Sequence, residues 1–408
     1  MTKFIKNTFI IFFILIIFTS KGFSQKSIII FKTDYSNNYM NYAIYDLIIK
    51  NIFLYSNLKI INSYSNYSSY NKIKSQIKKL TINNNANISI AYQIQNFKNG
   101  ILINYIIFDN EKPNEWIEKS VYSKEEDLFI SINKILKDIY EISKIKNKIT
   151  YIKEKDYISL LGYYSQKIIL TNNEDNIYKL FYDFHKDNIY FNIDYLEYLT
   201  DKSDRTSVDI INDLIKNMQN YINKKKNHYY LYSLGCMHYG KYKVNVILSD
   251  IEASIENYNK ALKLKNNYYK YYYRLANAYI LKNDYDNAIK YYEEAIKLNE
   301  YDINIIKEFV SLLKRDINKN GNEVISYLKK IIEINKNDEE ALEEISKLYE
   351  KIGDYDNALI YYNKLFEVIN YNLYIINNET KDADAYDRYI FKRNSIKLNI
   401  ESLNKKIF

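Results

Sequence analysis

The segment Tyr269–Asp302 reads YKYYYRLANAYILKNDYDNAIKYYEEAIKLNEYD. Apolar and small residues recur in it at helical spacing on both sides of a polar turn at residues 283–286. The residues of these two stripes are Leu275, Ala276, Tyr279, Ala288, Tyr292 and Ala295. The alanines allow two helices to approach closely, and the tyrosine rings fill the space between them. The segment therefore predicts a helix-turn-helix unit whose two helices pack through these residues.

Residues 339–372 repeat this pattern in the same order. The corresponding packing residues are Ile345, Tyr349, Ala358 and Tyr362, and Gly353-Asp354-Tyr355 stands at the turn. Both segments resemble the tetratricopeptide repeat, a helix-turn-helix unit of 34 residues. The resemblance implies an α-solenoid, in which each repeat buries its apolar face only against its neighbours.

The chain around these two copies predicts a longer all-α array. Its further parts are degenerate helical repeats at 150–226, weaker repeats at 228–268 and 303–338, and a C-terminal capping helix at 383–406. The first weaker repeat is expected to carry about seven extra residues between its helices, near 239–250. The second is expected to carry two extra residues around Asn320-Gly321. Ile396 and Leu403 give the capping helix its apolar face.

Composition places the chain among globular proteins of more than one domain. It has 408 residues, 47% of them hydrophobic, and a single proline, which fits a largely helical chain. The formal charge is +8. Without Lys3, Lys6 and Lys21 of the leader, 55 basic and 50 acidic residues remain, which is a charge of +5. This excess is too small to indicate a nucleic-acid partner.

Residues 1–24 have the features of a secretory signal peptide. Two lysines precede an apolar run at residues 9–18, and Gly22 and Ser24 stand at the −3 and −1 positions before Gln25. An uncleaved anchor is the alternative, but the run is about half of the roughly 20 residues that a membrane-spanning helix needs. We therefore expect export to the periplasm or cell envelope, or secretion.

Residues 25–148 combine strand and helix patterns and are predicted to form an α+β domain. Its predicted strands are 27–31, 58–61, 88–95, 101–108 and 116–121, and its predicted helices are 38–55, one that ends near residue 80, and 124–145. The first strand, helix and second strand predict a βαβ unit with parallel strands. The last three strands follow one another across short turns, which predicts an antiparallel meander.

This element order resembles the amino-terminal domain of the periplasmic protein TolB and of FlgO-like envelope proteins. The resemblance rests on Ile28-Ile29-Ile30-Phe31 at the opening strand, Leu58-Lys59-Ile60-Ile61 at the second strand, and the segments 108–116 and 123–130. Asn114 stands where that family usually has a glycine, and these motifs are looser than the repeats. The alternative is an unrelated α+β domain with the same element order.

Patterns for catalysis and metal binding are weak. His185 and His228 have no carboxylate or serine at catalytic spacing, and His238 follows Cys236 at a spacing that indicates zinc only when a second ligand pair follows. The single cysteine excludes an intrachain disulfide, and 7 glycines supply no phosphate loop. We therefore expect no enzyme activity, no cofactor and no metal.

In tetratricopeptide-repeat proteins the first helices of successive repeats line a concave groove. The corresponding positions are Lys270, Tyr273, Asn277, Ile280 and Leu281 in the first strong repeat, and Glu340, Glu343, Lys347, Glu350 and Lys351 in the second. Some relatives hold a peptide's terminal carboxylate with a Lys/Asn/Lys/Arg clamp, of which this chain has only Asn277. A mixed aromatic and charged groove fits a docked peptide or helix instead. The alternative is that these side chains merely solvate the groove.

Together these features predict an exported scaffold or adaptor that binds a protein or peptide partner in the bacterial cell envelope through the solenoid groove. No nucleic-acid partner is expected, and no membrane span after cleavage of the signal peptide. Two alternatives stay open: a structural envelope or flagellum-associated component without a discrete ligand, and an enzyme with a site between the domains. Fold alone does not name the partner.

Overall fold

A computed structural model describes residues 26–407 apart from several short segments. The segments left out of it are 33–38, 57, 62–69, 98–99, 115, 125, 145–151, 154–156, 158–159, 161–177, 179–180, 183–184, 186–187, 203, 219–226 and 381. The predicted signal peptide and the predicted domain boundary at 148–150 lie outside the described residues. The described residues form two compact units that divide between Tyr271 and Tyr272. None of the described helices is long and apolar enough to cross a membrane.

The first unit begins with a five-stranded mixed sheet of order β2-β1-β3-β4-β5. Its strands are β1 (Ser27–Lys32), β2 (Lys59–Ile61), β3 (Ile88–Phe97), β4 (Gly100–Asp109) and β5 (Trp116–Ser123). β1 pairs in parallel with β2 and β3, whereas β3, β4 and β5 pair antiparallel. The sheet thus contains a parallel pair and an antiparallel meander, and β1 joins them.

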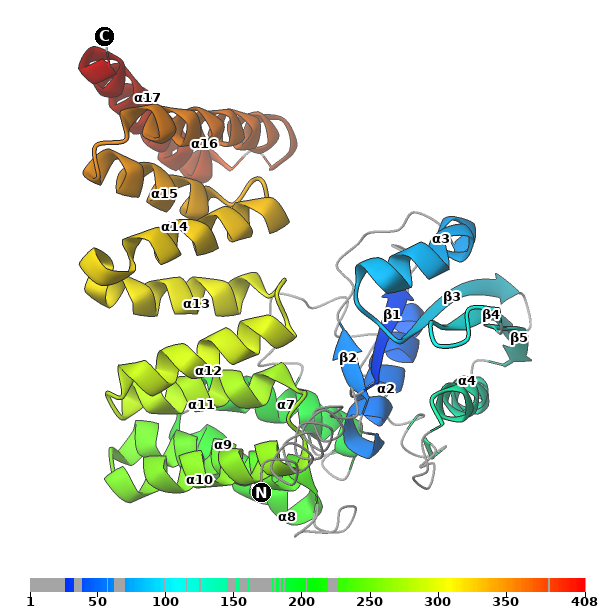
Figure 1. Ribbon diagram of the computed structural model, residues 1–408. Coiled ribbons are helices and arrows are strands. Elements are labelled where there is room, and N and C mark those ends of the chain that lie inside the picture. Colours follow the sequence, from blue (N-terminus) through cyan, green and yellow to red (C-terminus); the bar gives the residue numbers. More distant parts are fainter. Residues whose placement is uncertain are drawn as a thin grey trace, which may run out of the picture. The chain divides into compact units, whose positions relative to one another are not determined.

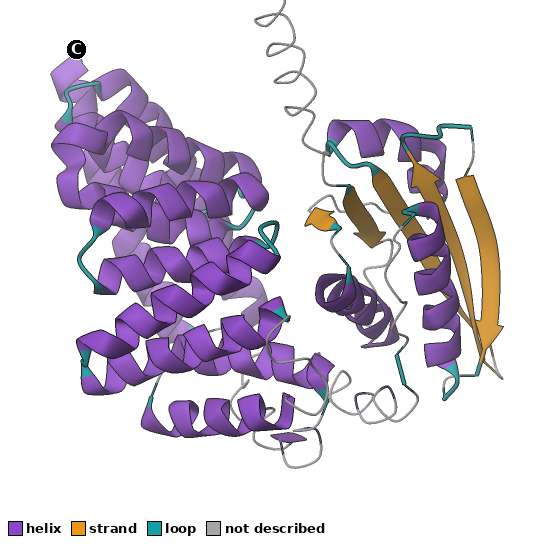
Figure 2. Cartoon of the chain, turned by 60° about the horizontal axis from the view of Figure 1, so that its bottom comes forward, coloured by secondary structure: helices purple, strands orange, loops and turns teal. Residues whose placement is uncertain are grey.

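Helices cover both faces of this sheet (Figures 1 and 2). They are α2 (Tyr39–Tyr55), α3 (Tyr70–Asn83) and α4 (Leu128–Ile142). Ile29 and Phe31 of β1 pack with Ile73 of α3 on one face. On the other face, the Tyr105 hydroxyl of β4 donates a 2.6 Å hydrogen bond to Asp138 of α4. Cover on both faces explains why β1 is a continuous apolar run and not an alternating one.

The C-terminal end of α2 is buried against other parts of the first unit. Lys265 donates a 2.8 Å hydrogen bond from Nζ to the Ser56 carbonyl, and its ammonium lies 5.4 Å from the centre of the Phe53 ring. The Phe53 ring also meets the His228 ring edge-on at 5.2 Å, and His228 hydrogen-bonds to the backbone of Phe53 and Leu54. The last carbonyls of a helix have no partner within it. Lys265 and His228 therefore act as caps for α2 from distant parts of the chain.

Four helices of the first unit belong to the predicted repeat array. They are α7 (Ile189–Lys202), α8 (Arg205–Met218), α9 (His228–Asn245) and α10 (Leu248–Leu264). The extra residues predicted between the two helices near 239–250 lie largely within α9 instead, because α9 continues to Asn245. Val246 then reverses the chain in the left-handed conformation, with φ 57°. The extra residues lengthen α9. Lys243 and Asn245 in this part of the helix are exposed, whereas Tyr239 and Gly240 are buried.

The second unit is all helical, and α11 (Tyr269–Leu281) begins just before the division. Its other helices are α12 (Tyr285–Leu298), α13 (Ile303–Leu313), α14 (Ile317–Ile334), α15 (Glu339–Lys351), α16 (Tyr355–Ile375) and α17 (Ala383–Ile407). The extra residues predicted around Asn320-Gly321 lie inside α14. A short 3₁₀ helix, Lys314–Asp316, makes the turn instead. The helix α17 covers the residues predicted for the capping helix.

Aspartates begin four of these helices. The side chains of Asp284, Asp302, Asp338 and Asp354 each accept a hydrogen bond from the backbone N–H three residues further on. The preceding turn of both strong repeats needs a left-handed residue, which is Asn283 at φ 60° in one and Gly353 at φ 82° in the other. Asparagine and glycine adopt this conformation most readily. These local signals explain why the two strong repeats were recognisable from sequence.

Candidate functional site

The residues predicted to pack the two strong repeats lie inside the helix contacts. The buried ones are Leu275, Ala276, Ala288, Tyr292, Ala295, Ile345, Tyr349, Ala358 and Tyr362. Tyr279 is half-buried and stacks on the ring of Tyr291 at 5.4 Å. Tyr349 stacks on Tyr361 in the same way at 5.7 Å. The alanines thus allow the helix backbones to approach closely, and the tyrosine rings fill the remaining space between the helices.

Two of the predicted groove residues of α11, Tyr273 and Asn277, belong to a polar network in the second unit. The Tyr273 hydroxyl donates to Glu308 at 2.9 Å, and the Tyr292 hydroxyl lies 2.5 Å from the Asn277 side-chain oxygen and 3.0 Å from Glu308. Burial is the main cause that raises the pKa of Tyr273 above its ordinary value. Ile280 and Leu281 are half-buried. Asn277 therefore has a partner within the protein.

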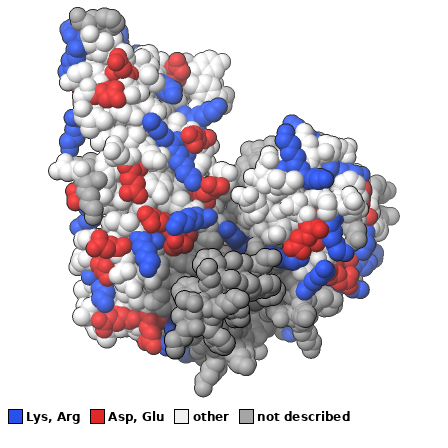
Figure 3. All heavy atoms as spheres, viewed as in Figure 1, with Lys and Arg blue, Asp and Glu red and all other residues white. Residues whose placement is uncertain are grey.

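Two of the predicted groove acids of α15, Glu343 and Glu350, are contacted by α17. Lys392 lies 3.6 Å from Glu343, and Lys406 lies 3.1 Å from Glu350. Although burial acts to raise it, hydrogen bonds from Lys347 and the charge of that lysine hold the pKa of Glu343 below its ordinary value. Lys347 and Lys351 are exposed. In Figure 3 basic and acidic side chains are interspersed on the visible face of this unit, at the upper left, so no patch of one sign forms there.

A small pocket opens between α13 and α15, over α14. Its volume is about 100 Å³, and its apolar floor consists of Val310, Leu328, Ile331 and Ala341. A cavity of about 150 Å³ is large enough for benzene. The α13–α15 pocket is therefore of a size to receive one aliphatic side chain and too small for a cofactor.

Charged side chains form the rim of the α13–α15 pocket. Lys307 lies 3.0 Å from Asp338 and 2.7 Å from Glu340, and Lys314 lies 2.5 Å from Glu344. Burial acts to lower the pKa of Lys307, but the hydrogen bonds that its ammonium donates to Glu340 and Asp338 raise it overall. The Glu340 side chain is 66% exposed and that of Lys314 is 44% exposed. An apolar floor with an exposed charged rim can hold a peptide by one side chain and its polar flanks.

Three rim residues were not singled out by the sequence reasoning, because the repeat at 303–338 matched the pattern weakly. Lys307, Ser311 and Lys314 lie 34 residues after Tyr273, Asn277 and Ile280 respectively. The length of the repeat would have located them. Of the predicted residues, only Glu340 contributes to this pocket.

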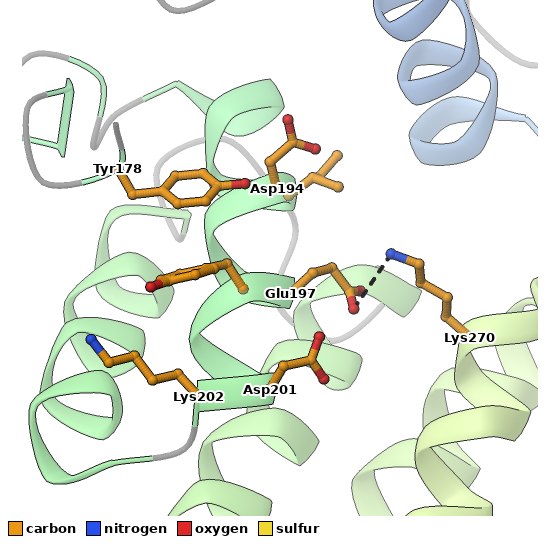
Figure 4. A pocket seen from close by; sticks show the side chains of 8 residues that line it. Tyr178, Asp194, Glu197, Asp201, Lys202 and Lys270 are labelled. Atoms are coloured by element: carbon orange, nitrogen blue, oxygen red, sulfur yellow. Dashed lines mark ion pairs between the residues drawn. The ribbon is translucent and has the colours of Figure 1, made fainter. Parts of the chain in front are cut away.

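Lys270 lies in a different hollow, which belongs to the first unit. It is about 710 Å³ in volume, and Asp194, Glu197 and Asp201 of α7 line one side of it (Figure 4). Lys270 points toward Glu197 at 3.5 Å, and the Tyr232 hydroxyl donates to the same carboxylate at 2.7 Å. Asp194 is 2.8 Å from Lys50. Because Glu197 and Asp194 have basic partners and Lys202 also lines the hollow, it is not a strongly anionic site.

The histidines and the cysteine occupy packing positions. His185 is buried and stacks on Phe181, and burial lowers its pKa. His238 lies 3.1 Å from Asp250, and Cys236 is fully buried near the Tyr258 hydroxyl. Within the described part of the chain, no group of three or more His, Cys, Asp or Glu side chains could hold a metal ion.

Comparison with known proteins agrees with the repeat pattern. No curated protein matches the chain. Among solved structures, two of MamA are 22% identical with TM-scores of 0.32, covering 40% and 47% of this chain and 91% and 95% of their own. YrrB, described as a TPR protein with an unusual peptide-binding site, is 16% identical with a TM-score of 0.29, covering 46% of this chain and 89% of its own. Family models of the tetratricopeptide repeat match residues 269–302 and 339–372, and the chain therefore contains two tetratricopeptide repeats.

Proposed function

We propose that this protein is a scaffold that binds a peptide segment of a partner protein at the α13–α15 pocket. The observation that carries the proposal is an apolar floor open between two first helices and bordered by exposed ion pairs. The two matched tetratricopeptide repeats support a role in protein–protein interaction.

The chemistry of the pocket defines the segment that it fits. One aliphatic side chain would fill the floor and exclude water, which gains about 25 cal/mol for each Å² of apolar surface buried. The rim offers lysine ammonium groups and glutamate carboxylates side by side, so flanking residues of either charge find a partner. A segment with an aliphatic residue between charged residues fits best, and the exposed Lys347 extends the surface along α15.

A single bulky substitution at the rim should abolish this binding. Ser311 is exposed and lines the pocket, so the ring in Ser311→Phe would cover the floor. We expect peptides selected from a displayed random library against the parent protein to bind this variant at least about tenfold more weakly, since one well-filled pocket contributes about 1–3 kcal/mol. Isothermal titration with the selected peptides measures the change.

The control is Ser326→Phe, the same substitution at an exposed position of α14 that does not line the pocket. It should bind the selected peptides as the parent does. If the library yields no binders, or if both variants bind them equally, the assignment of the pocket is wrong.

For location, we infer that the protein acts in the cell envelope after export. The support is the signal-peptide pattern of residues 1–24 and the resemblance of residues 25–148 to the TolB and FlgO-like domains. We expect the native protein to begin near Gln25, and intact-mass and peptide spectrometry of protein purified from its own cells would show it. A native species that retains Met1 or Thr2 would contradict cleavage.

A further inference from the structure

The terminal helix α17 has one face inside the array and one outside it. Its inner face includes Ile396, 4% exposed, and Leu403, fully buried. Lys392 on this side lies 2.7 Å from Glu339 of α15. The terminal helix of a solenoid normally closes the array with a polar outer face.

The outer face of α17 departs from that rule. Phe391 is 78% exposed and Leu398 is 65% exposed. Asp384, Phe391, Leu398 and Lys405 follow one another at intervals of seven residues, so they form one row along the helix. All four side chains are exposed among the described residues. The row has an acid near its start, a base near its end and two large apolar residues between them.

This row is complementary to itself when reversed. In an antiparallel pair of α17 helices related by an axis between Asn394 and Ser395, Phe391 of each copy lies opposite Leu398 of the other. The same register places Asp384 opposite Lys405 of the second copy. It also places Arg388 opposite Glu401, which within its own helix has only Lys397 at 4.0 Å. Apolar residues thus meet apolar residues, and opposite charges meet at both ends.

We propose that the outer face of α17 is a docking surface for α17 of a second copy of this chain, in a two-fold antiparallel dimer. Such an interface uses the same patch on both subunits, which is the commonest form of homodimer contact. A single helix pair buries less than the roughly 1,200 Å² of a standard stable interface. The dimer is therefore expected to dissociate at micromolar concentration and to form wherever the protein is locally concentrated.

Charge reversal provides a test that separates pairing from folding. Asp384→Lys alone places lysines against Lys405 at both ends, and Lys405→Asp alone places aspartates against Asp384 at both ends. Each variant should dimerise about tenfold more weakly than the parent in sedimentation equilibrium. An equimolar mixture of the two should dimerise as the parent does, because a mixed pair has opposite charges at both ends. Recovery on mixing also shows that both variants are folded.

The apolar pair is tested in the same way. Phe391→Glu should leave the protein monomeric over the concentrations at which the parent dimerises, whereas Tyr374→Glu, at a 63% exposed ring on α16, should not. Glu367→Lys, at an exposed site of α16, is the control for charge reversal. A parent that stays monomeric up to about 1 mM overturns the proposal. So does a mixture of the charge variants that remains as weak as its components, or a dimer that Phe391→Glu does not affect.

Discussion

The free energy of unfolding of the first unit is expected to fall steeply as the pH is lowered, by about 1.4 kcal/mol per pH unit within the range of each of two buried groups. These groups are Lys265 and His228, which cap the end of α2. Burial lowers the pKa of Lys265 to about 7. Burial and then the nearby charge of Lys265 lower the pKa of His228 to about 3. The free energy of unfolding therefore increases with pH, whereas the loss of an ion pair at high pH would decrease it.

The sign follows from proton binding. A lysine in the unfolded chain holds its proton up to about pH 10.4, and a histidine up to about 6.5. The folded unit releases the Lys265 proton near pH 7 and holds His228 neutral down to about 3. Between about pH 7 and 10 for the lysine, and between about 3 and 6.5 for the histidine, the unfolded state binds the extra proton. Stability therefore rises with pH across both windows and is lost on acidification.

Lys265→Met isolates the contribution of the lysine. Near pH 6 the variant should be more stable than the parent, because no charge has to be buried. Near pH 9 it should be less stable by about 1–3 kcal/mol, because the Ser56 carbonyl loses its donor. The two stability curves should cross near neutral pH. Urea unfolding followed by fluorescence of Trp116, the single tryptophan, reports on this unit because Trp116 begins β5.

Lys263→Met is the matched control, since Lys263 is exposed two residues away and its charge stays in water. Its stability should run parallel to that of the parent from pH 6 to 9. Parallel curves for Lys265→Met as well would mean that Lys265 remains charged in the folded unit, and the account of the α2 end would be wrong.

The contacts at the buried end of α2 could not be predicted from the sequence. Strands and helices of the first unit could be predicted because their signals are local: an apolar run in β1, alternation in β3 and β4, and helical periods elsewhere. Nothing periodic relates Phe53 to His228 or Lys265. Lys265 stands between Leu264 and Asn266 and has the pattern of an ordinary polar connection. Its burial depends on a contact across the fold, which a single sequence does not reveal.

The α13–α15 pocket was not predicted from the sequence, for a similar reason. Groove positions follow from the repeat period, which depends on capping aspartates and small residues within one repeat. The α13–α15 pocket depends instead on what remains unfilled between two neighbours, and the weak repeat at 303–338 supplies most of its rim. Lys392 forms ion pairs with both Glu339 and Glu343, and it lies far along the chain in a segment that lacks the repeat pattern. Ion pairs between residues so far apart in the sequence can be identified only from the structure.

Replacing glycine by alanine in two helices should change the stability of the protein in opposite directions. A methyl group on Gly235 in α9 would meet the ring of Tyr258 in α10 well inside van der Waals contact. That ring is fully buried, and its hydroxyl lies near Cys236. We expect Gly235→Ala to lower the free energy of unfolding of the first unit by about 1–3 kcal/mol through overpacking, against its gain in helix propensity. Trp116 fluorescence in urea measures it.

Gly321 in α14 is the matched control, because a methyl group there would meet nothing within 4 Å. Gly321→Ala should stabilise α14 by about 0.5–1 kcal/mol, since glycine in a helix costs that much relative to alanine. Slower amide exchange in α14, measured by mass spectrometry, would show it. If Gly235→Ala also stabilised its unit, the close approach of α9 and α10 would be refuted.

A double-mutant cycle assigns the cost of Gly235→Ala to the ring and not to the helix. Tyr258→Leu removes the ring that the new methyl group would meet, at its own cost of a buried aromatic side chain. In that background Gly235→Ala should be close to neutral, so the two changes together should cost less than their sum by about 1–3 kcal/mol. Additive costs would mean that the methyl group is rejected by the α9 backbone itself. The coupling therefore tests whether Gly235 is present because Tyr258 needs the space above it, as the alanines of the two strong repeats make space for their own tyrosines.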